Sequence, residues 1–315
     1  MAIDSRSPPL FLGVDSGGTK TRAICATVGT EGRLCIQGIG VGGPGNPLSS
    51  GIDAATNAIA AATRQALDDA RVETTLPQRG VFAVAGAAHE ASRQELTDRL
   101  NSLGLADHCE VVPDYTPLFA TAEPDLPAAA IVIGTGSVVF VRDATGNIFR
   151  SGGWGYLLGD EASGYAIGKA AVQVTLRAHE HGLPMGEVGH LVLTQLGCPR
   201  PDDLLKTIYA AADSRRLLAS LAKGIFQLEP NDAAAAQIIA EAGEEFSQTV
   251  ERALQTAGIG EAELRVEFTG SVALASESFR QRILQPLKTH WNIGAKPLLL
   301  RDPAEACLHM AAAIA

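Results

Sequence analysis

A glycine-rich turn near the start of the chain carries residue types that suit a phosphate and a metal ion. Asp15-Ser16-Gly17-Gly18-Thr19-Lys20 follows the apolar run at residues 10–14. Glycines in such a turn let backbone N–H groups approach a phosphate closely. Asp15 could hold Mg²⁺ through water, while Thr19 and Lys20 offer a hydroxyl and an ammonium group. The same residues also suit an ordinary glycine hairpin with a capping aspartate.

A second glycine turn occurs further along the chain, and an apolar stretch again precedes it. Gly134-Thr135-Gly136-Ser137 follows residues 129–133. One such turn is a weak signal, because hairpins with glycine are common. Two of them, one opening each half of the chain, are more specific, since hairpins from two domains could hold a triphosphate between them.

Strands are expected to position both turns. The first half predicts strands at 10–14, 21–28, 34–39, 80–85 and 110–113, a loop at 40–47, and helices at 52–72 and 89–103. The second half predicts strands at 129–133, 138–142, 148–150, 264–268 and 297–300, and helices at 161–179, 185–196, 201–211, 215–223, 232–257 and 303–315. The strand, turn, strand order of the first half returns in the second, which indicates a duplicated α/β unit.

Length and composition indicate a globular chain of two domains. The chain has 315 residues, of which 46% are hydrophobic and 19% are charged. A formal net charge of −10 disfavours a broad surface for nucleic-acid phosphates, so no nucleic-acid partner is expected. The five scattered cysteines predict reduced thiols in the cytoplasm rather than disulfides or a cysteine metal site. The first residues lack a signal-peptide pattern, and the most apolar stretch, 128–141, is too short to cross a bilayer.

Three longer segments resemble one known family. They are FLGVDSGGTKTRA at residues 11–23, IVIGTGS at 131–137 and, most specifically, GGWGYLLGDEASGYAIGKAAV at 152–172. These segments look like the N-acetylglucosamine kinase branch of the BadF/BadG/BcrA/BcrD-type ATPase family, and the resemblance covers essentially the whole chain. The family belongs to the superfamily of sugar kinases, actin and heat-shock chaperones.

The resemblance implies an α/β fold of two ribonuclease H-like (actin-like ATPase) domains with a central interdomain cleft. The domains expected are 1–122 together with the terminal helix at 303–315, and 123–302. Domain closure on sugar binding and a homodimer are further expectations at the level of the family.

The resemblance also implies roles for the glycine turns. The first turn, Asp15 to Lys20, would handle Mg²⁺ and the β- and γ-phosphates of ATP, and the second, Gly134 to Ser137, would close on them. Gly270 and Ser271 would form the turn beside the adenosine, although relatives usually carry two glycines there. Lys20 is the one cation expected beside the phosphates.

The catalytic and sugar-binding roles also follow from the resemblance. Asp114 matches the catalytic aspartate, which can accept a proton from the attacking sugar hydroxyl. Its alternative is a turn-forming aspartate before Tyr115-Thr116-Pro117. The sugar would contact Asn46, Gly153, Trp154 and Asp160. Asn46 could instead be a turn residue, and Asp160 could cap the helix predicted at 161–179. Segment 85–87 lies where some relatives place a serine against the sugar, so that contact is open here.

The activity implied is an ATP- and Mg²⁺-dependent kinase that phosphorylates the 6-hydroxyl of N-acetylglucosamine. Glucosamine and N-acetylmuramic acid are alternative acceptors, and the sequence does not decide between the three sugars. Two readings from other classes are an ATPase that drives a conformational change in a partner protein and a non-catalytic sugar sensor. The first of these needs cysteines for an iron–sulfur cluster between subunits, for which this chain lacks a suitable pair.

Overall fold

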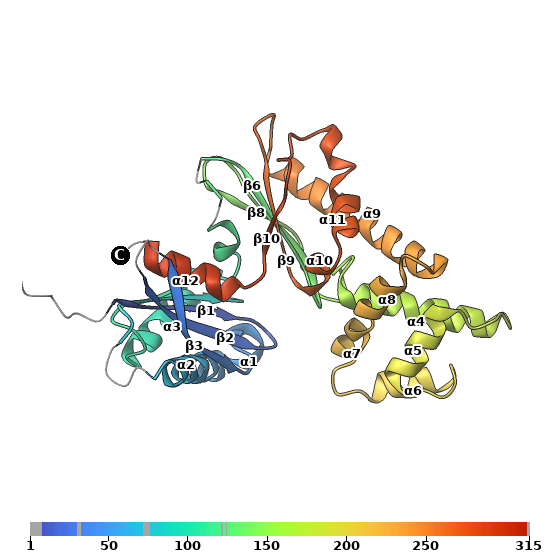
Figure 1. The fold of residues 1–315 in the computed structure, drawn as a ribbon, viewed down its shortest axis with the longest axis horizontal. Coiled ribbons are helices and arrows are strands. Elements are labelled where there is room, and N and C mark those ends of the chain that lie inside the picture. The colour runs from blue at the N-terminus through green and yellow to red at the C-terminus, as the bar shows by residue number, and fades with distance from the viewer. Residues whose placement is uncertain (1–7, 30–32, 72–75, 121, 124, 314–315) are drawn as a thin grey trace, which may run out of the picture. The chain divides into compact units, whose positions relative to one another are not determined.

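The computed structural model describes residues 8–29, 33–71, 76–120, 122–123 and 125–313 (Figure 1). The chain forms two compact units. Unit 1 comprises residues 1–121 and 302–315, and unit 2 comprises residues 122–301. The domains expected from the sequence differ from these units by one residue at each boundary, and their independence as folding domains stays a prediction, as does the interdomain cleft.

Unit 1 is a five-stranded mixed sheet with helices on both faces. Its elements are β1 (Leu10–Ser16), β2 (Thr21–Val28), β3 (Leu34–Gly42), α1 (Pro47–Ser50), α2 (Ile52–Asp69), β4 (Arg79–Val84), α3 (Glu90–Ser102), β5 (Cys109–Pro113), the 3-10 helix η2 (Thr116–Phe119) and α12 (Pro303–Ala313). The strand order is β3-β2-β1-β4-β5. The first three strands are antiparallel neighbours, whereas β4 and β5 run parallel to β1.

Alternating apolar residues in the strands build a core on each face of this sheet. On one face, Leu12 and Phe82 pack with α2 and α3 through residues such as Ile59. On the other face, Phe11 packs with Leu308 of α12. Figure 1 shows α12 along one side of the sheet and α2 along the other. The last helix of the chain thus completes the core of the first unit.

The outer strand β3 lies against α2 without side chains between them. Gly38, Gly40 and Gly42 face the helix, and a Cβ atom on Gly40 would overlap the carbonyl oxygen of Ala62. This close approach lets α2 side chains reach the strand backbone. The N–H of Ile39 donates to Asp69 Oδ2 (3.0 Å), and that of Val41 donates to Gln65 Oε1 (2.6 Å).

Unit 2 repeats the strand arrangement and adds helices. Its elements are β6 (Ala128–Ile133), β7 (Ser137–Arg142), β8 (Ile148–Gly152), α4 (Gly164–Glu180), α5 (Glu187–Leu196), α6 (Asp203–Ala210), α7 (Ser214–Ser220), α8 (Ala222–Leu228), α9 (Ala233–Thr256), β9 (Arg265–Thr269), α10 (Ser271–Ala275), α11 (Glu277–Leu284), the 3-10 helix η3 (Leu287–Thr289) and β10 (Leu298–Leu300). The strand order is β10-β9-β6-β7-β8. Counted along each unit and taken from the β3 or the β8 edge, both sheets have the order third, second, first, fourth, fifth strand. The α/β fold expected from the sequence is confirmed.

Three differences from the predicted elements have a structural reason. The strand β3 continues to Gly42, into the stretch predicted as a loop, because its glycines pack on α2. The helix predicted at 215–223 is two short helices, α7 and α8, which meet at Leu221. The helix predicted to begin at Glu161 begins at Gly164, because Ala162 has a φ of 60° and Ser163 is the N-cap. The expectation that Asp160 caps this helix is therefore wrong.

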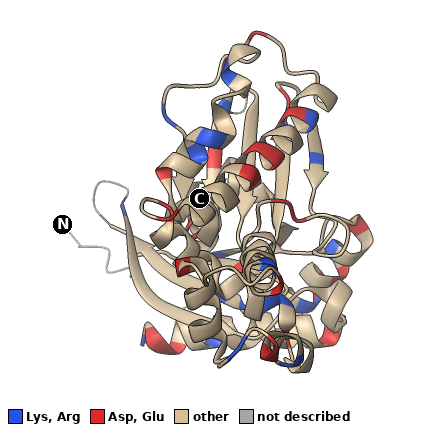
Figure 2. Ribbon diagram, turned by 90° about the vertical axis from the view of Figure 1, so that its right-hand side faces the viewer, with Lys and Arg blue, Asp and Glu red and all other residues tan. Residues whose placement is uncertain are grey.

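The described residues show mixed charges on their helices, free thiols and no long apolar helix. In Figure 2, acidic and basic segments are interspersed along the helices rather than gathered in one basic stripe on the face shown. All five cysteines have free thiols, and only Cys35 is exposed. None of the helices in the described ranges combines the length and apolarity that a bilayer crossing requires.

Candidate functional site

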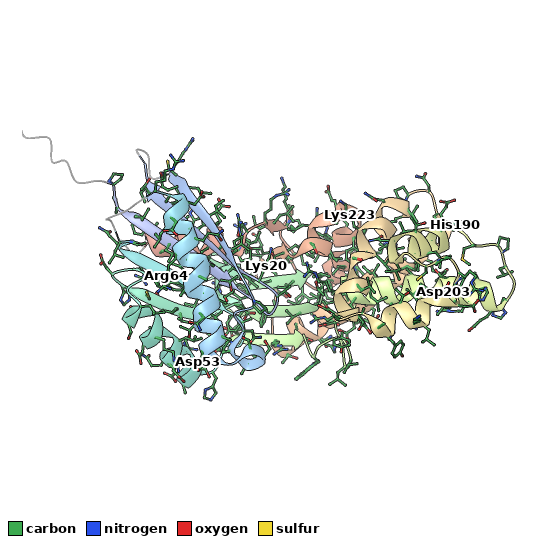
Figure 3. All side chains as sticks on the ribbon, turned by 90° about the horizontal axis from the view of Figure 1, so that it is seen from below. Lys20, Asp53, Arg64, His190, Asp203 and Lys223 are labelled. Carbon is green, nitrogen blue, oxygen red and sulfur yellow. The ribbon has the colours of Figure 1, made fainter. Side chains whose placement is uncertain are left out.

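The first glycine turn joins β1 to β2 in unit 1 and is open to solvent. The N–H of Gly17 donates to the carbonyl of Lys20 (2.9 Å), which closes the turn. Gly18, Thr19 and Lys20 are exposed, and among the described residues nothing lies within 4 Å of a Cβ placed on Gly18. Figure 3 labels Lys20 on this turn. The turn presents glycine backbone, a hydroxyl and one ammonium group to a ligand.

A buried hydroxyl pair supports this turn from the strand side. Ser16 and Thr21 hydroxyls lie 2.9 Å apart, and the Thr21 hydroxyl donates to the carbonyl of Gly43 (2.9 Å). The N–H of Gly45 donates to the carbonyl of Gly17 (2.9 Å). The loop after β3 is thereby fixed against the first glycine turn, and any side chain at Gly45 would overlap the Ser16 hydroxyl.

Three carboxylates influence one another at this end of unit 1. Burial, followed by the negative charges of Asp114 and Asp302, raises the pKa of Asp15 from 3.8 to about 6, and the Lys20 ammonium opposes that rise. Asp302 is itself paired with the guanidinium of Arg22 at 2.7 Å. The site therefore concentrates negative charge that a cation would relieve.

Parallel pairing places Asp114 at the same edge of the sheet as Asp15. Ser16 of β1 pairs with Val84 of β4, and Val84 pairs with Pro113 of β5. The carboxyl ends of the three parallel strands therefore coincide, which is where α/β sheets carry their ligands. Asp114 comes directly after β5, as the sequence predicted, and its catalytic role stays a prediction.

Asn46 lies in the loop after β3 and caps α1. Its side-chain oxygen accepts from the N–H of Leu48 (2.9 Å). A Cβ on Gly86 would overlap the same oxygen, and Gly86 has a φ of 84°, so the loop after β4 passes directly beside Asn46. The turn-forming role of Asn46 is thus observed, contact between Asn46 and a sugar stays a prediction, and contact between segment 85–87 and a sugar stays an open question.

The second glycine turn joins β6 to β7 in unit 2. The N–H of Gly134 donates to the carbonyl of Gly136 (2.8 Å), and the N–H of Gly164 donates to the carbonyl of Gly134 (2.7 Å). The turn is therefore anchored on the first residue of α4. Gly270, with a φ of 94°, packs so closely on Ile133 that a Cβ would overlap its carbonyl oxygen. The two predicted nucleotide turns of unit 2 are neighbours.

Ser137 closes the second turn and is buried. Its N–H donates to Asp160 Oδ1 (3.2 Å), and its hydroxyl donates to the carbonyl of Glu161 (2.6 Å). Both polar groups of Ser137 are thus engaged inside unit 2. Its predicted role as a phosphate ligand stays a prediction, whereas the observed contacts support the conformation of the turn.

A pocket of about 400 Å³ opens beside these two turns. It is lined by Gly134, Thr135, Gly164, Ala219, Ser220, Ala222, Lys223, Phe226, Ser271, Val272 and Ala275. Of these lining residues, Lys223 alone is charged, and Figure 3 labels it. A mostly apolar slot with one cation and glycine backbone at its rim suits a purine base joined to phosphates.

The loop after β8 exposes an aromatic ring. Gly152, Gly153 and Gly155 all have φ between 71° and 85°, a conformation that favours glycine. Trp154, between them, is 69% exposed, and the guanidinium of Arg150 lies 5.4 Å from its ring centre. An exposed indole can stack against the apolar face of a sugar ring.

Asp160 ends this loop and is almost fully buried. One carboxylate oxygen accepts from the N–H of Ser137, and the other is paired with Arg215 Nη2 at 3.2 Å. Both oxygens therefore have partners within unit 2. Contact between Asp160 and a sugar stays a prediction.

Sequence motifs did not point to several residues of these sites. Asp302 reaches the Asp15 edge because it directly precedes α12, which returns to the first sheet, and there it pairs with Arg22 of β2. Lys223 and Arg215 lie on two short helices that carry no recognisable motif. A lone basic residue on a helix gives no signal before its neighbours in space are known.

The two sheets share one strand order, and each has a glycine turn after its first strand. The chain belongs to the BadF/BadG/BcrA/BcrD ATPase family, which it matches over residues 12–292. Membership of this ATPase family implies the use of ATP.

Two named kinases are similar in sequence. The N-acetylmuramic acid/N-acetylglucosamine kinase of Clostridium acetobutylicum is 27% identical over 214 residues, which is 67% of this chain and 68% of that protein. The N-acetyl-D-glucosamine kinase of Dictyostelium discoideum is 27% identical over 218 residues, which is 64% of this chain and 65% of that protein. The matched region thus spans about two thirds of each relative.

Solved structures show the same fold over nearly the whole chain. A candidate N-acetylglucosamine kinase from Porphyromonas gingivalis has a TM-score of 0.74 at 21% identity, covering 97% of this chain and 99% of that one. A ROK family glucokinase from Streptomyces griseus has a TM-score of 0.58 at 17% identity, covering 97% and 99%. At these identities the likeness concerns the fold.

Proposed function

We propose that the protein is an ATP-dependent amino-sugar kinase that phosphorylates the 6-hydroxyl of N-acetylglucosamine. The observation that carries this proposal is the alignment of Asp114 with the first glycine turn at one edge of the first sheet. Membership of the ATPase family supports the use of ATP, and the names of the two sequence relatives support the class of acceptor.

The residues of unit 1 fit Mg²⁺ as the metal that accompanies the nucleotide. Asp15, Asp114 and Asp302 are hard oxygen donors whose mutual repulsion a divalent cation would relieve. No three His, Cys, Asp or Glu side chains of the described residues gather closely enough to hold a metal by themselves. Mg²⁺ keeps several waters and takes phosphate oxygens as ligands, so it is commonly held by only one or two carboxylates. When bound, Mg²⁺ neutralises charge on the phosphates during transfer.

Asp114 would act as the general base. Its carboxylate would accept the proton of the sugar 6-hydroxyl while the oxygen attacks the terminal phosphorus, and ADP would leave. Asn46 and Trp154 would orient the sugar, the first through its amide and the second by stacking on the ring. Gly153 and Asp160 complete the proposed sugar contacts.

The nucleotide would use both glycine turns. Gly17, Gly18, Thr19 and Lys20 would contact the terminal phosphates, and the residues from Gly134 to Ser137 would contact the same phosphate chain. Gly270, Ser271 and Lys223 line or border the pocket proposed for the adenosine. Backbone amides carry most of this binding in a chain with a net charge of −10.

A panel of acceptors tests the proposal directly. ATP and Mg²⁺ are held constant while N-acetylglucosamine, N-acetylmuramic acid, glucosamine and glucose are compared by ADP release, and the product's phosphate position is assigned by NMR. We expect sugar-dependent ADP release, fastest with N-acetylglucosamine, and a 6-phosphate product. ATP hydrolysis that is the same with and without every sugar would contradict the proposal.

Asp114→Asn tests the base, with Asp107→Asn as the matched control. Asp107 is an exposed aspartate just before β5, at the opposite end of the strand. We expect Asp114→Asn to lose at least about a hundredfold in kcat, since general bases contribute on that order, while Asp107→Asn keeps wild-type activity. Equal activity of the two variants would remove Asp114 from the mechanism.

N-acetylmuramic acid is the favoured alternative acceptor, because the name of the Clostridium relative includes it. Glucosamine has no such support. A partner-activating ATPase is the alternative of another class, and iron–sulfur absorption bands in anaerobically purified protein would favour it. A cytoplasmic location and a homodimer are parts of this proposal that scattering and cell fractionation would test.

A further inference from the structure

Arg215, on α7, is held against the second glycine turn by its partners. Its Nη2 lies 3.2 Å from Asp160 Oδ2, and its guanidinium lies 5.8 Å from the ring centre of Tyr156. A Cβ placed on Gly136 would come within 2.5 Å of the same nitrogen and 2.8 Å of Asp160 Oδ2. The ion pair therefore touches the turn itself.

The negative charge of the Asp160 carboxylate is unfavourable for phosphate binding at this position. Its side chain is 4% exposed, and its other oxygen accepts from the N–H of Ser137 in the turn. A buried negative charge in contact with a phosphate-binding turn repels phosphate, because little solvent lies between the two charges to screen them. The Asp160 carboxylate thus shapes the turn through its hydrogen bond, while its negative charge opposes the binding of phosphate there.

The guanidinium of Arg215 offsets that charge. It reaches Asp160 from the helix side, and its side chain remains 38% exposed. The Tyr156 ring, centred 5.8 Å from the guanidinium carbon, holds the guanidinium beside the carboxylate by a cation–π contact. The pair as a whole is neutral, so the carboxylate can hold the Ser137 N–H without adding net negative charge to the turn.

We propose that Arg215 is a positioning residue for the nucleotide, which neutralises Asp160 at the second glycine turn and so allows this turn to accept the phosphate chain. This inference rests on the proposed function, because it requires that the turn binds a nucleotide. It assigns a nucleotide-side role to an arginine outside every motif, and it predicts that the nucleotide and sugar constants respond differently to its loss.

Arg215→Gln is the first test, with Arg216→Gln as the matched control. Arg216 is the next residue of α7 and is exposed. ADP binding without sugar is measured by calorimetry, and KM is measured separately for ATP and for N-acetylglucosamine. We expect Arg215→Gln to weaken ADP binding and raise the KM for ATP about tenfold, which is the order of one charge interaction that solvent partly screens, since the Arg215 side chain is 38% exposed. The KM for sugar should rise less than the KM for ATP, because Asp160, also a proposed sugar contact, keeps its hydrogen bond from the Ser137 N–H in this variant, and Arg216→Gln should behave as wild type.

Asp160→Asn in the Arg215→Gln background separates neutralisation from direct contact. Asparagine keeps the oxygen that accepts from Ser137 but removes the charge. We expect the double variant to recover ADP binding to within about threefold of wild type, since the repulsion is gone. Failure to recover would mean that Arg215 acts in some other way, and equal changes in both KM values would also overturn the proposal.

The melting temperature and two further variants distinguish a loss of folding from a loss of ADP binding. An unpaired buried carboxylate can destabilise a protein, so the melting temperature of each variant is recorded. If Arg215→Gln does not fold, the double variant, which buries no unpaired charge, and Arg215→Lys, which keeps the charge, carry the test. Both should bind ADP, and tenfold weaker binding by both would refute the role. Wild-type protein that binds no ADP would instead overturn the proposed function, and this inference with it.

Discussion

Replacing Asp15 by asparagine should stabilise the ligand-free protein while abolishing its activity. The carboxyl of Asp15 has a pKa of about 6, against 3.8 ordinarily, because it is buried and faces Asp114 and Asp302. At neutral pH the ionised carboxylate of Asp15 therefore destabilises the folded protein. Each pKa unit corresponds to about 1.4 kcal/mol, so the charge costs at most about 3 kcal/mol of folding stability.

The sign of the pH dependence follows from the raised pKa. Between pH 6 and pH 3.8 the folded protein binds a proton at Asp15 that the unfolded chain lacks, so acidification through this window removes the cost. Asp15→Asn has no such proton. Its stability advantage over wild type should therefore be about 1–3 kcal/mol at pH 7 and should shrink towards pH 4.

Urea unfolding of the ligand-free proteins at pH 7, 6 and 5 measures this difference. Asp107→Asn serves as control, because Asp107 is exposed, and it should match wild type at each pH. A variant that is less stable than wild type at pH 7, or an advantage that stays constant as the pH falls, would refute the reasoning. Mg²⁺ with ADP should stabilise wild type more than the variant.

Three further outcomes are expected. Gly40→Ala should destabilise the protein by about 1–3 kcal/mol in urea unfolding, because its methyl group would overlap the Ala62 carbonyl; wild-type stability would contradict the packing. Lys223→Gln should weaken ADP binding about fivefold by calorimetry, since an exposed ion pair contributes about 1 kcal/mol; unchanged binding would place the nucleotide elsewhere. Trp154→Ala should raise the KM for sugar about three- to tenfold with the KM for ATP unchanged, and the reverse pattern would exclude stacking on the sugar.

The strands and the glycine turns could be predicted from the sequence because their signals are local. Apolar runs beside a glycine turn define β1, β2, β6 and β7 within a few residues. The start of α4 could not be placed, since Asp160 and Ala162 adopt positive φ without being glycine. That conformation depends on the contact of Asp160 with Ser137, which lies far away in the sequence.

The residues of the candidate site also fall into those that local sequence predicts and those that it does not. Asp15, Asn46 and Asp114 belong to motifs, and each lies at the end of an element where the motif placed it. Asp302 and Lys223 come to their sites through the packing of whole helices, which residue types alone do not encode. The charges around a site are therefore harder to predict than its loops, because charge acts through space.

The docking of α2 on the outer strand β3 also protects the protein from association. An edge strand with open N–H groups is a template for strands of other chains. Here Gln65 and Asp69 occupy the N–H groups of Val41 and Ile39, and the glycine face leaves a foreign strand no room on the helix side. Because β3 is synthesised before α2, the edge stays uncovered until the helix follows. The growing chain thus exposes an open strand edge during this interval, and the glycines that let α2 dock closely also let it cover that edge.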